Sequence, residues 1–350
     1  MRKKTYMGTF LITGGAGFFG SILKEELLKL GHKVISIDIE PDNYKNDNFV
    51  AIQDDICNVD ILEKLFTEHK FDAVFHLAAK LAHVKKDIPK LWASNVDGTQ
   101  NIYSMCKKHN VNKIIFTSTN CLWAKNFEYE VTEEEPPMPV EIYGKSKFEG
   151  EKILLQESNI KSIIFRCPTI VDEGRLGLLS ILFDFINENR KIWMVGNGGN
   201  KYQFIYAKDL ASACIFALEY NNTDIFNIGS DNVKSFNDVY NYIIKKTNSK
   251  SKLVHLPKKP MILAMKICHK LGISPLGPYQ YKMISENFVF NTSKIKKILN
   301  FHPTKSNEEM LLISYEYYKN NKEEIHNRKN VSAHKSAAAM GIIRLLKLFS

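Results

Sequence analysis

Short apolar runs rich in β-branched and aromatic residues alternate with amphipathic stretches through the first half of the chain. This alternation is typical of βα units that build a parallel sheet. Beyond residue 166 the regularity falls, because prolines and a glycine-rich loop at 196–199 interrupt the chain. Residues 203–228 show a further strand, helix and strand pattern. The predicted strands of the first half are 9–13, 33–38, 50–53, 73–77, 113–118 and 162–166.

This pattern predicts two domains in the 350 residues. The first is a Rossmann-type, doubly wound parallel α/β sheet over residues 1–170, to which residues 203–230 return. The second is a smaller C-terminal α/β domain for the substrate, built from residues 171–202 and 231–322. Residues 323–350 are left as a basic amphipathic tail.

Composition restricts the class of protein. Hydrophobic residues make up 44% of the chain and charged residues 25%, values typical of a soluble globular protein. No apolar run reaches the roughly 18 to 20 residues that span a bilayer, so we expect a cytoplasmic protein. The six cysteines lack the spacing of a disulfide framework or a metal site, so we expect free thiols and no metal.

The formal net charge of +10 raises the question of nucleic acid. Basic residues do not alternate with aromatic residues in any stretch, so nucleic acid is not an expected partner. Half of the excess charge lies in the acid-free tail after residue 324, and the remainder fits an anionic ligand or solubility. The basic residues of the tail are Arg328, Lys329, Lys335, Arg344 and Lys347.

The end of the tail, residues 337–349, combines Arg344 and Lys347 with apolar residues at a spacing that fits a short amphipathic helix. Two interpretations are open. The tail either attaches peripherally to an anionic membrane or docks on the protein's own surface.

A glycine-rich segment at 13–20 directly follows the first apolar strand and opens a helix. A phosphate-binding loop of a dinucleotide site requires this context. Gly14 would permit the tight turn, Gly17 the approach of the backbone to a pyrophosphate, and Gly20 the close packing of the helix. The amides at the start of the helix would face the anion.

The second predicted strand ends in Asp38, whose carboxylate could bind both hydroxyls of an adenosine ribose and would repel a 2′-phosphate. This favours NAD over NADP as the cofactor. The alternative is that Asp38 is a simple strand-end residue. Asp55 and Ile56, after the third strand, would flank the adenine, unless Asp55 only caps a helix.

Tyr143 and Lys147 lie where a helix should begin, and their spacing of four residues places them on one helical face. A nearby ammonium and a positive nicotinamide favour the phenolate of a tyrosine, whose ordinary pKa is about 10, so Tyr143 could act as acid and base. The pair alone is weak evidence, because many solvated helices carry it. However, the fifth strand delivers Thr117, Ser118 and Thr119 at its carboxyl end, where a parallel sheet places its ligands.

Together these residues resemble the extended short-chain dehydrogenase/reductases, specifically the NAD-dependent epimerase/dehydratase family. The likeness extends from residue 9 to about residue 320. It rests on the glycine loop, Thr119, Tyr143 and Lys147, and on four further segments. Those segments are His76-Leu77-Ala78-Ala79, Asn95-Val96-Asp97-Gly98-Thr99, residues 203–213 and Phe226-Asn227-Ile228-Gly229.

The resemblance implies a role for each candidate. Thr119 corresponds to the family's catalytic Ser/Thr, Tyr143 to the acid/base, and Lys147 to the residue that binds the nicotinamide ribose and lowers the tyrosine pKa. Asn95 would support the structure near the fifth strand, and Arg166 would lie at the exit towards the substrate. The implied cofactor-binding residues are Gly14, Gly17, Phe18, Phe19, Gly20, Asp38, Asp55, Ile56, Leu77, Ala78, Ala79, Asn95, Tyr143 and Lys147.

The sequence departs from the family pattern on the substrate side. Gln203 stands where many members carry an arginine that grips a nucleotide diphosphate. Arg175, Lys201 or Lys208 would then have to compensate. The predicted substrate contacts are Cys121, Arg166, Arg175 and Gln203.

The residues after Thr119 bear on the type of reaction. Asn120 and Cys121 replace the Asp-Glu pair of the family's 4,6-dehydratases, which disfavours dehydration. Cys121 falls where the family's 3,5-epimerases carry a cysteine acid/base, and a thiolate near a lysine could abstract a proton next to a ketone. The alternative is a packing thiol.

The resemblance implies an NAD-dependent epimerase of a nucleotide-linked sugar that acts through a transient ketone, with a homodimer as the family expectation. An alternative is a dehydrogenase or ketoreductase that exchanges NAD(H) at each turnover. A third is a non-catalytic NAD-binding regulator, which the intact set of Thr119, Tyr143 and Lys147 disfavours.

Overall fold

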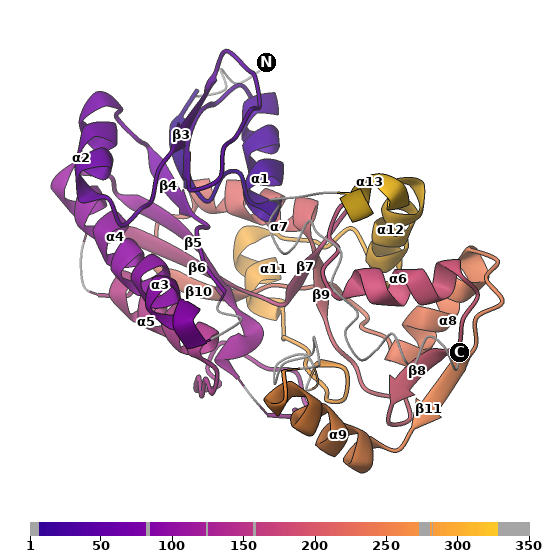
Figure 1. The fold of residues 1–350 in the computed structure, drawn as a ribbon. Coiled ribbons are helices and arrows are strands. Elements are labelled where there is room, and N and C mark those ends of the chain that lie inside the picture. The colour runs from indigo at the N-terminus through magenta and orange to yellow at the C-terminus, as the bar shows by residue number, and fades with distance from the viewer. Residues whose placement is uncertain are drawn as a thin grey trace.

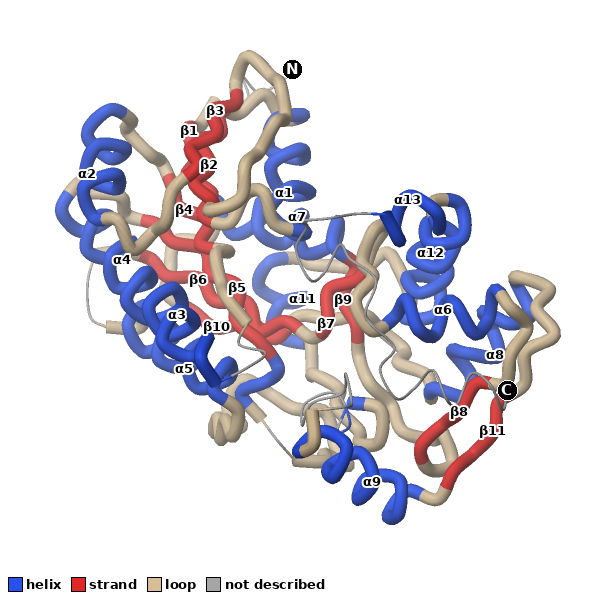
Figure 2. Tube along the Cα trace, in the orientation of Figure 1, coloured by secondary structure: helices blue, strands red, loops and turns tan. Residues whose placement is uncertain are grey.

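The central feature of the computed structural model is a seven-stranded parallel sheet with the order β10-β6-β5-β4-β1-β2-β3, shown in Figures 1 and 2. The structure describes residues 7–81, 85–123, 125–156, 159–272, 281 and 283–327, so the predicted amphipathic end of the tail lies outside it. The sheet confirms the Rossmann-type, doubly wound expectation. Its strands are β1 (Thr9–Thr13), β2 (Lys33–Asp38), β3 (Phe49–Gln53), β4 (Ala73–His76), β5 (Lys113–Thr119), β6 (Lys161–Cys167) and β10 (Asp224–Asn227).

Helices cover both faces of this sheet, which explains why its strands are apolar on both sides. Phe10 and Ile12 of β1 pack into one core with α1 (Phe18–Lys29), α7 (Ala207–Phe216) and α11 (Ser293–Leu299). Leu11, between them, points to the opposite core. That second core is formed with α2 (Val59–Glu68), α4 (Gly98–Lys108) and α5 (Ile142–Leu154); α3 (Ile88–Trp92) precedes α4.

A smaller unit beside the large sheet contains two two-stranded parallel sheets (Figure 2). The segment 203–230, predicted to return to the first domain, divides: β10 joins the large sheet, whereas β9 (Phe204–Tyr206) pairs with β7 (Thr169–Val171). None of the described helices is both long and apolar enough to cross a membrane. The other elements are β8 (Ile192–Val195), which pairs with β11 (Leu253–Leu256), and α6 (Leu179–Asn187), α8 (Phe236–Lys246), α9 (Lys258–Lys270), α12 (Asn307–Asn320) and α13 (Lys322–Asn327).

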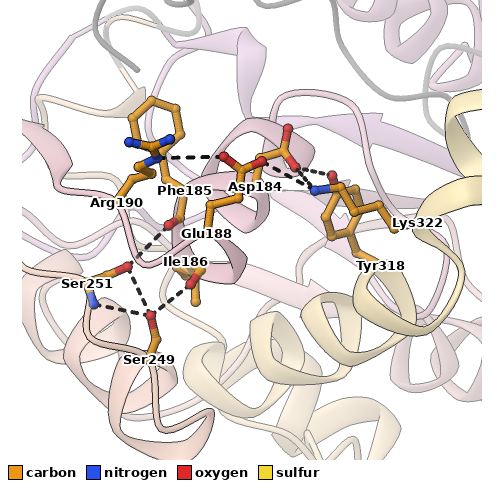
Figure 3. Close-up of polar contacts among 9 residues, drawn as sticks. All are labelled: Asp184, Phe185, Ile186, Glu188, Arg190, Ser249, Ser251, Tyr318 and Lys322. Atoms are coloured by element: carbon orange, nitrogen blue, oxygen red, sulfur yellow. Dashed lines mark hydrogen bonds and ion pairs between the residues drawn. The ribbon is translucent and has the colours of Figure 1, made fainter. Parts of the chain in front are cut away.

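Polar contacts join the helices of the smaller unit (Figure 3). The buried Tyr318 of α12 donates its hydroxyl to Asp184 Oδ1 of α6 at 2.6 Å, and Lys322 Nζ lies 2.8 Å from the same oxygen. Ser249 donates to the carbonyl of Ile186 at 2.8 Å. Ile325 of α13 is also buried, so the first residues of the predicted tail belong to this unit.

A buried ion pair fixes the loop that follows β2. Lys24 of α1 is 2% exposed, and its Nζ lies 2.6 Å from Asp42 Oδ2. The same ammonium faces the rings of Tyr44 and Phe49, 4.6 and 4.7 Å from their centroids. The loop is therefore held against α1 at the end of the sheet where Asp38 lies.

We predict that Lys24→Met lowers the free energy of unfolding by about 3 kcal/mol, because Asp42 loses its cation in a buried position. Lys29→Met is the matched control on the same helix, because its side chain is 65% exposed and its pair with Glu26 should contribute less than about 1 kcal/mol. Urea denaturation followed by circular dichroism measures both. Equal losses in the two variants would contradict a structural role for the buried pair.

Candidate active site

The glycine loop makes a tight turn that only glycine can occupy. Gly14 has a φ of +77°, and a Cβ at this position would lie 2.8 Å from the amide nitrogen of Ala78. A Cβ at Gly20 would collide with the carbonyl of Gly14. The turn at Gly14 and the close packing at Gly20 predicted from the sequence are therefore confirmed.

The start of α1 is open to an anion. Its N-cap, Gly17, has no side chain to accept hydrogen bonds from the first-turn amides, and the first turn carries no acidic residue. These amides and the helix dipole are the features that bind a pyrophosphate. Phe18 and Phe19 are each 7% exposed, and Ile56 is 4% exposed. The side chains of all three residues pack in the hydrophobic core.

One carboxylate contacts this loop, and a second lies after β3. Asp38 ends β2, is partly exposed, and accepts a hydrogen bond from the amide of Ala16 at 3.0 Å. Asp55 accepts from the amide of Cys57, and Lys80 Nζ lies 3.6 Å from it. Burial acts to raise the pKa of Asp55, but the hydrogen bonds and the Lys80 cation outweigh it and lower the pKa. Asp55 therefore stays ionised.

A buried histidine connects β1 to β4 and α4. His76 Nδ1 lies 2.7 Å from the hydroxyl of Thr13, and Nε2 lies 2.8 Å from that of Thr99. The Thr99 hydroxyl donates to the carbonyl of Asn95, and the Thr13 oxygen accepts from the amides after β4, which fits a neutral ring protonated at Nε2. Complete burial lowers the pKa of His76 to about 3, with Lys147 adding to the effect. His76 therefore supports the site and is not placed to exchange protons with solvent.

Asn95 extends this network to α5. It lies in a π-helical turn, Ala93–Asp97, between α3 and α4, and is 1% exposed. Its side chain accepts from the amide of Lys80 at 2.7 Å and donates to its carbonyl at 3.0 Å. It also donates to Ser146 of α5 at 2.9 Å. Leu77 and Ala78, partly exposed, and Ala79, exposed, lie in the segment between His76 and Lys80.

The first turn of α5 packs directly against the end of β5. Thr119 is 7% exposed and accepts from the amide of Cys121 at 3.1 Å in the 3-10 turn Asn120–Leu122. Gly144 allows the close approach, because a Cβ there would collide with the carbonyl of Cys121. Tyr143, next to Gly144 and partly exposed, is thereby brought to the same edge of the sheet as Thr119.

Lys147 is an almost fully buried lysine on the same helix. It is 2% exposed, and its Nζ lies 3.8 Å from the centroid of the Phe116 ring. Loss of hydration lowers the pKa of Lys147 to about 7, although the neighbouring Cys167 and Glu151 act to raise it. An acceptor placed against this nitrogen would recover part of the cost of burying it.

Two predicted substrate contacts occupy structural positions instead. Arg166 is 3% exposed and forms a bidentate pair with Glu151, with Nε and Nη2 at 3.1 and 2.8 Å from the carboxylate oxygens. Gln203 is 1% exposed, donates to the carbonyl of Ser230, and accepts from the amide of Phe290. Neither side chain is accessible to a substrate, so both expectations need correction.

The other two predicted substrate contacts are closer to the site. Cys121 is partly exposed in the turn next to Thr119. Arg175 is also partly exposed, and its guanidinium lies 5.8 Å from the centroid of the Phe18 ring, at the start of α1. Arg175 is therefore near the glycine loop.

Glu151 is a supporting residue that the sequence reasoning missed. It is fully buried and lies four residues after Lys147 on the same helical face. An acidic residue at that spacing was a readable signal. Its pairing with Arg166, fifteen positions away on β6, required the tertiary structure.

The sheet order and the glycine turn define a Rossmann-type dinucleotide-binding protein. The model of the NAD dependent epimerase/dehydratase family matches residues 10–229. The chain belongs to this family of NAD-dependent enzymes, as predicted.

The chain is also similar to individual relatives and to a solved structure. The chain is 32% identical to the uncharacterized protein y4nG of Sinorhizobium fredii, over 97% of this chain and 85% of the relative. It is 27% identical to a UDP-glucuronate 4-epimerase of Thermodesulfobacterium geofontis, over 92% of this chain and 100% of the relative. A solved structure, the Bordetella bronchiseptica enzyme WbmG in complex with NAD, has the same fold with a TM-score of 0.75 at 18% identity, covering 97% and 100% of the two chains.

We predict that the buried His76 makes the protein less stable as the pH falls. Because its folded pKa of about 3 lies below its ordinary value of 6.5, the unfolded chain takes up the proton first, and stability is lost as the pH drops below 6.5. Between pH 7 and pH 5 this one group should cost about 2 kcal/mol.

Urea denaturation of the protein and of His76→Gln at both pH values measures this contribution. The variant should lose about 2 kcal/mol less than the unaltered protein on acidification. His302→Gln, at an exposed histidine, is the control and should keep the full pH dependence. An unchanged pH dependence in His76→Gln would show that His76 is not held neutral.

Proposed function

We propose that the protein is an NAD-dependent epimerase of a nucleotide-linked sugar that acts through a transient ketone. The observation that carries the proposal is the packing of the first turn of α5 against the end of β5, which Gly144 permits. This packing brings the backbone segments that carry Thr119 and Tyr143 together at the carboxyl edge of the sheet, and the buried Lys147 lies one helical turn after Tyr143. Dinucleotide enzymes of this fold bind their ligands at that edge.

The residues at the glycine loop fit NAD. The uncapped first turn of α1 would bind the pyrophosphate, and Asp38 would accept hydrogen bonds from the adenosine ribose while repelling a 2′-phosphate. Asp55 would lie on the adenine side, and Leu77, Ala78 and Ala79 would line the cofactor from the end of β4. When bound, NAD supplies a reversible acceptor for hydride.

The protein's own groups handle the proton. Thr119 already accepts from the Cys121 amide, so its hydroxyl hydrogen is free to hold the oxygen of the substrate. Tyr143 would remove the hydroxyl proton as the ketone forms and return it afterwards. Lys147 would bind the nicotinamide ribose, and its charge would favour the phenolate of Tyr143.

Support for the substrate class comes from relatives and from one cation. The name of the Thermodesulfobacterium relative specifies a UDP-sugar substrate. Arg175 is a cationic residue among the predicted substrate contacts, lies beside the start of α1 and is partly exposed. It would contact the diphosphate of the substrate. Arg166 and Gln203 have no part in the proposal. A cytoplasmic homodimer remains the expectation.

We predict that Tyr143→Phe lowers kcat by at least about 100-fold, because the acid/base group is lost, while NAD is still bound. Epimer formation from a panel of UDP-hexoses, followed by NMR, measures the activity. Tyr129→Phe, at a tyrosine that is 57% exposed, is the control and should leave kcat unchanged. Full activity in Tyr143→Phe would exclude this tyrosine as the acid/base.

The same preparation distinguishes an epimerase from a reductase. Denatured protein should release tightly held NAD that mass spectrometry can identify, because an epimerase returns the hydride in every cycle. A protein purified without nucleotide that oxidises NADH stoichiometrically with a carbonyl substrate would instead be a reductase.

Cys121 supports a second reaction type, because it lies partly exposed in the turn that holds Thr119. A thiolate there could remove a proton from the carbon next to the ketone. In heavy water, epimerisation by hydride return alone should give a product without deuterium on its carbons. Cys121→Ser should then keep full activity, with Cys57→Ser as the control at another partly buried thiol. Deuterium incorporation that disappears in Cys121→Ser would assign the acid/base role to Cys121.

A further inference from the structure

Helix α9 presents an apolar stripe to solvent. Leu263, Ile267 and Leu271 are 60%, 52% and 67% exposed, although large aliphatic side chains are usually buried. Their spacing of four residues places them along one side of the helix. No residue of α9 itself is buried, and α9 runs along the margin of the molecule in Figures 1 and 2.

A row of lysines runs beside this stripe. At 100° per residue, Lys259, Lys266 and Lys270 fall within a narrow arc next to Leu263, and all three are exposed. The helix contains no acidic residue. In the sequence, the stretch between Asp238 and Glu286 carries nine lysines and neither Asp nor Glu.

The charge of this surface indicates what covers it. A second copy of the chain docked through α9 would bring lysine rows of like charge together, which disfavours association. An anionic bilayer complements both features, because the aliphatic side chains enter the acyl boundary while the lysine ammonium groups reach the phosphates. A helix of 13 residues is too short to span, since spanning requires roughly 20 residues.

We propose that α9 docks the enzyme on anionic membranes, lying in the plane of the interface. Leu263, Ile267 and Leu271 insert, and Lys259, Lys266 and Lys270 bind the lipid phosphates. The proposal rests on α9 alone. It depends neither on the tail after residue 327 nor on the reaction assigned above.

Sedimentation with vesicles of phosphatidylglycerol and phosphatidylcholine tests the proposal. The unaltered protein should pellet with these vesicles, and neither with pure phosphatidylcholine nor in high salt. Leu263→Glu/Ile267→Glu should lower the partition coefficient at least tenfold, with an unchanged unfolding midpoint. Val59→Glu/Met138→Glu is the matched control, because it makes the same charge change at positions that are 47% and 67% exposed on other elements.

Three results with the full-length chain would overturn the proposal. They are the absence of binding to the anionic vesicles, an equal loss in the control variant, and full binding by Leu263→Glu/Ile267→Glu. Truncation after residue 327 distinguishes α9 from the tail as the membrane contact. If the truncated protein, with α9 intact, no longer binds the vesicles, the contact belongs to the tail. If Leu263→Glu/Ile267→Glu changes the oligomeric state and leaves vesicle binding intact, a second copy covers α9 instead.

Discussion

A buried chain of hydrogen bonds holds the two halves of the site together. It runs from Thr13, at the end of β1, through His76 and Thr99 to Asn95, and from there to Ser146 on α5. The first strand leads into the glycine loop, and α5 carries the tyrosine and lysine. Each buried polar side chain in this hydrogen-bond network has a partner. The network therefore fixes the position of the glycine loop relative to α5 at little desolvation cost. The neutral state of the histidine is part of this design, because complete burial disfavours its charge.

Two buried cationic side chains close to this network differ in what compensates for their lost hydration. Arg166 is matched by Glu151 in bidentate geometry, and its third contact is a backbone carbonyl. Lys147 faces an aromatic ring, and its pKa falls to about 7 because burial removes its hydration. The first arrangement is self-sufficient and holds β6 to α5. The second leaves a lysine with a lowered pKa, and such perturbed groups cluster at functional sites.

The substrate side differs from the pattern that the family resemblance implied. Gln203 occupies the position of an expected arginine, but its amide joins Ser230 to Phe290 inside the fold. In the proposed function, recognition of the substrate diphosphate would therefore come from other side chains, and Arg175 lies near the glycine loop. The same half of the molecule carries α9, with its exposed aliphatic and lysine rows. The proposed substrate contact and the proposed membrane contact therefore both lie in the part of the chain where periodicity was weakest.

The sequence alone determined the elements whose pattern is local. The strands at 9–13 and 33–38, the turn at Gly14 and the helical spacing of Tyr143 and Lys147 could be read directly, because each depends on neighbouring residues and on backbone geometry. Only the tertiary structure decided the fate of Arg166 and Gln203, because a side chain's accessibility depends on partners far along the chain. It also decided that β9 leaves the large sheet for β7, since strand pairing is a long-range choice. The exposure of Leu263 and Ile267 was likewise visible only in the tertiary structure. The sequence of an apolar helix is the same whether its apolar face is buried against the protein or exposed to solvent.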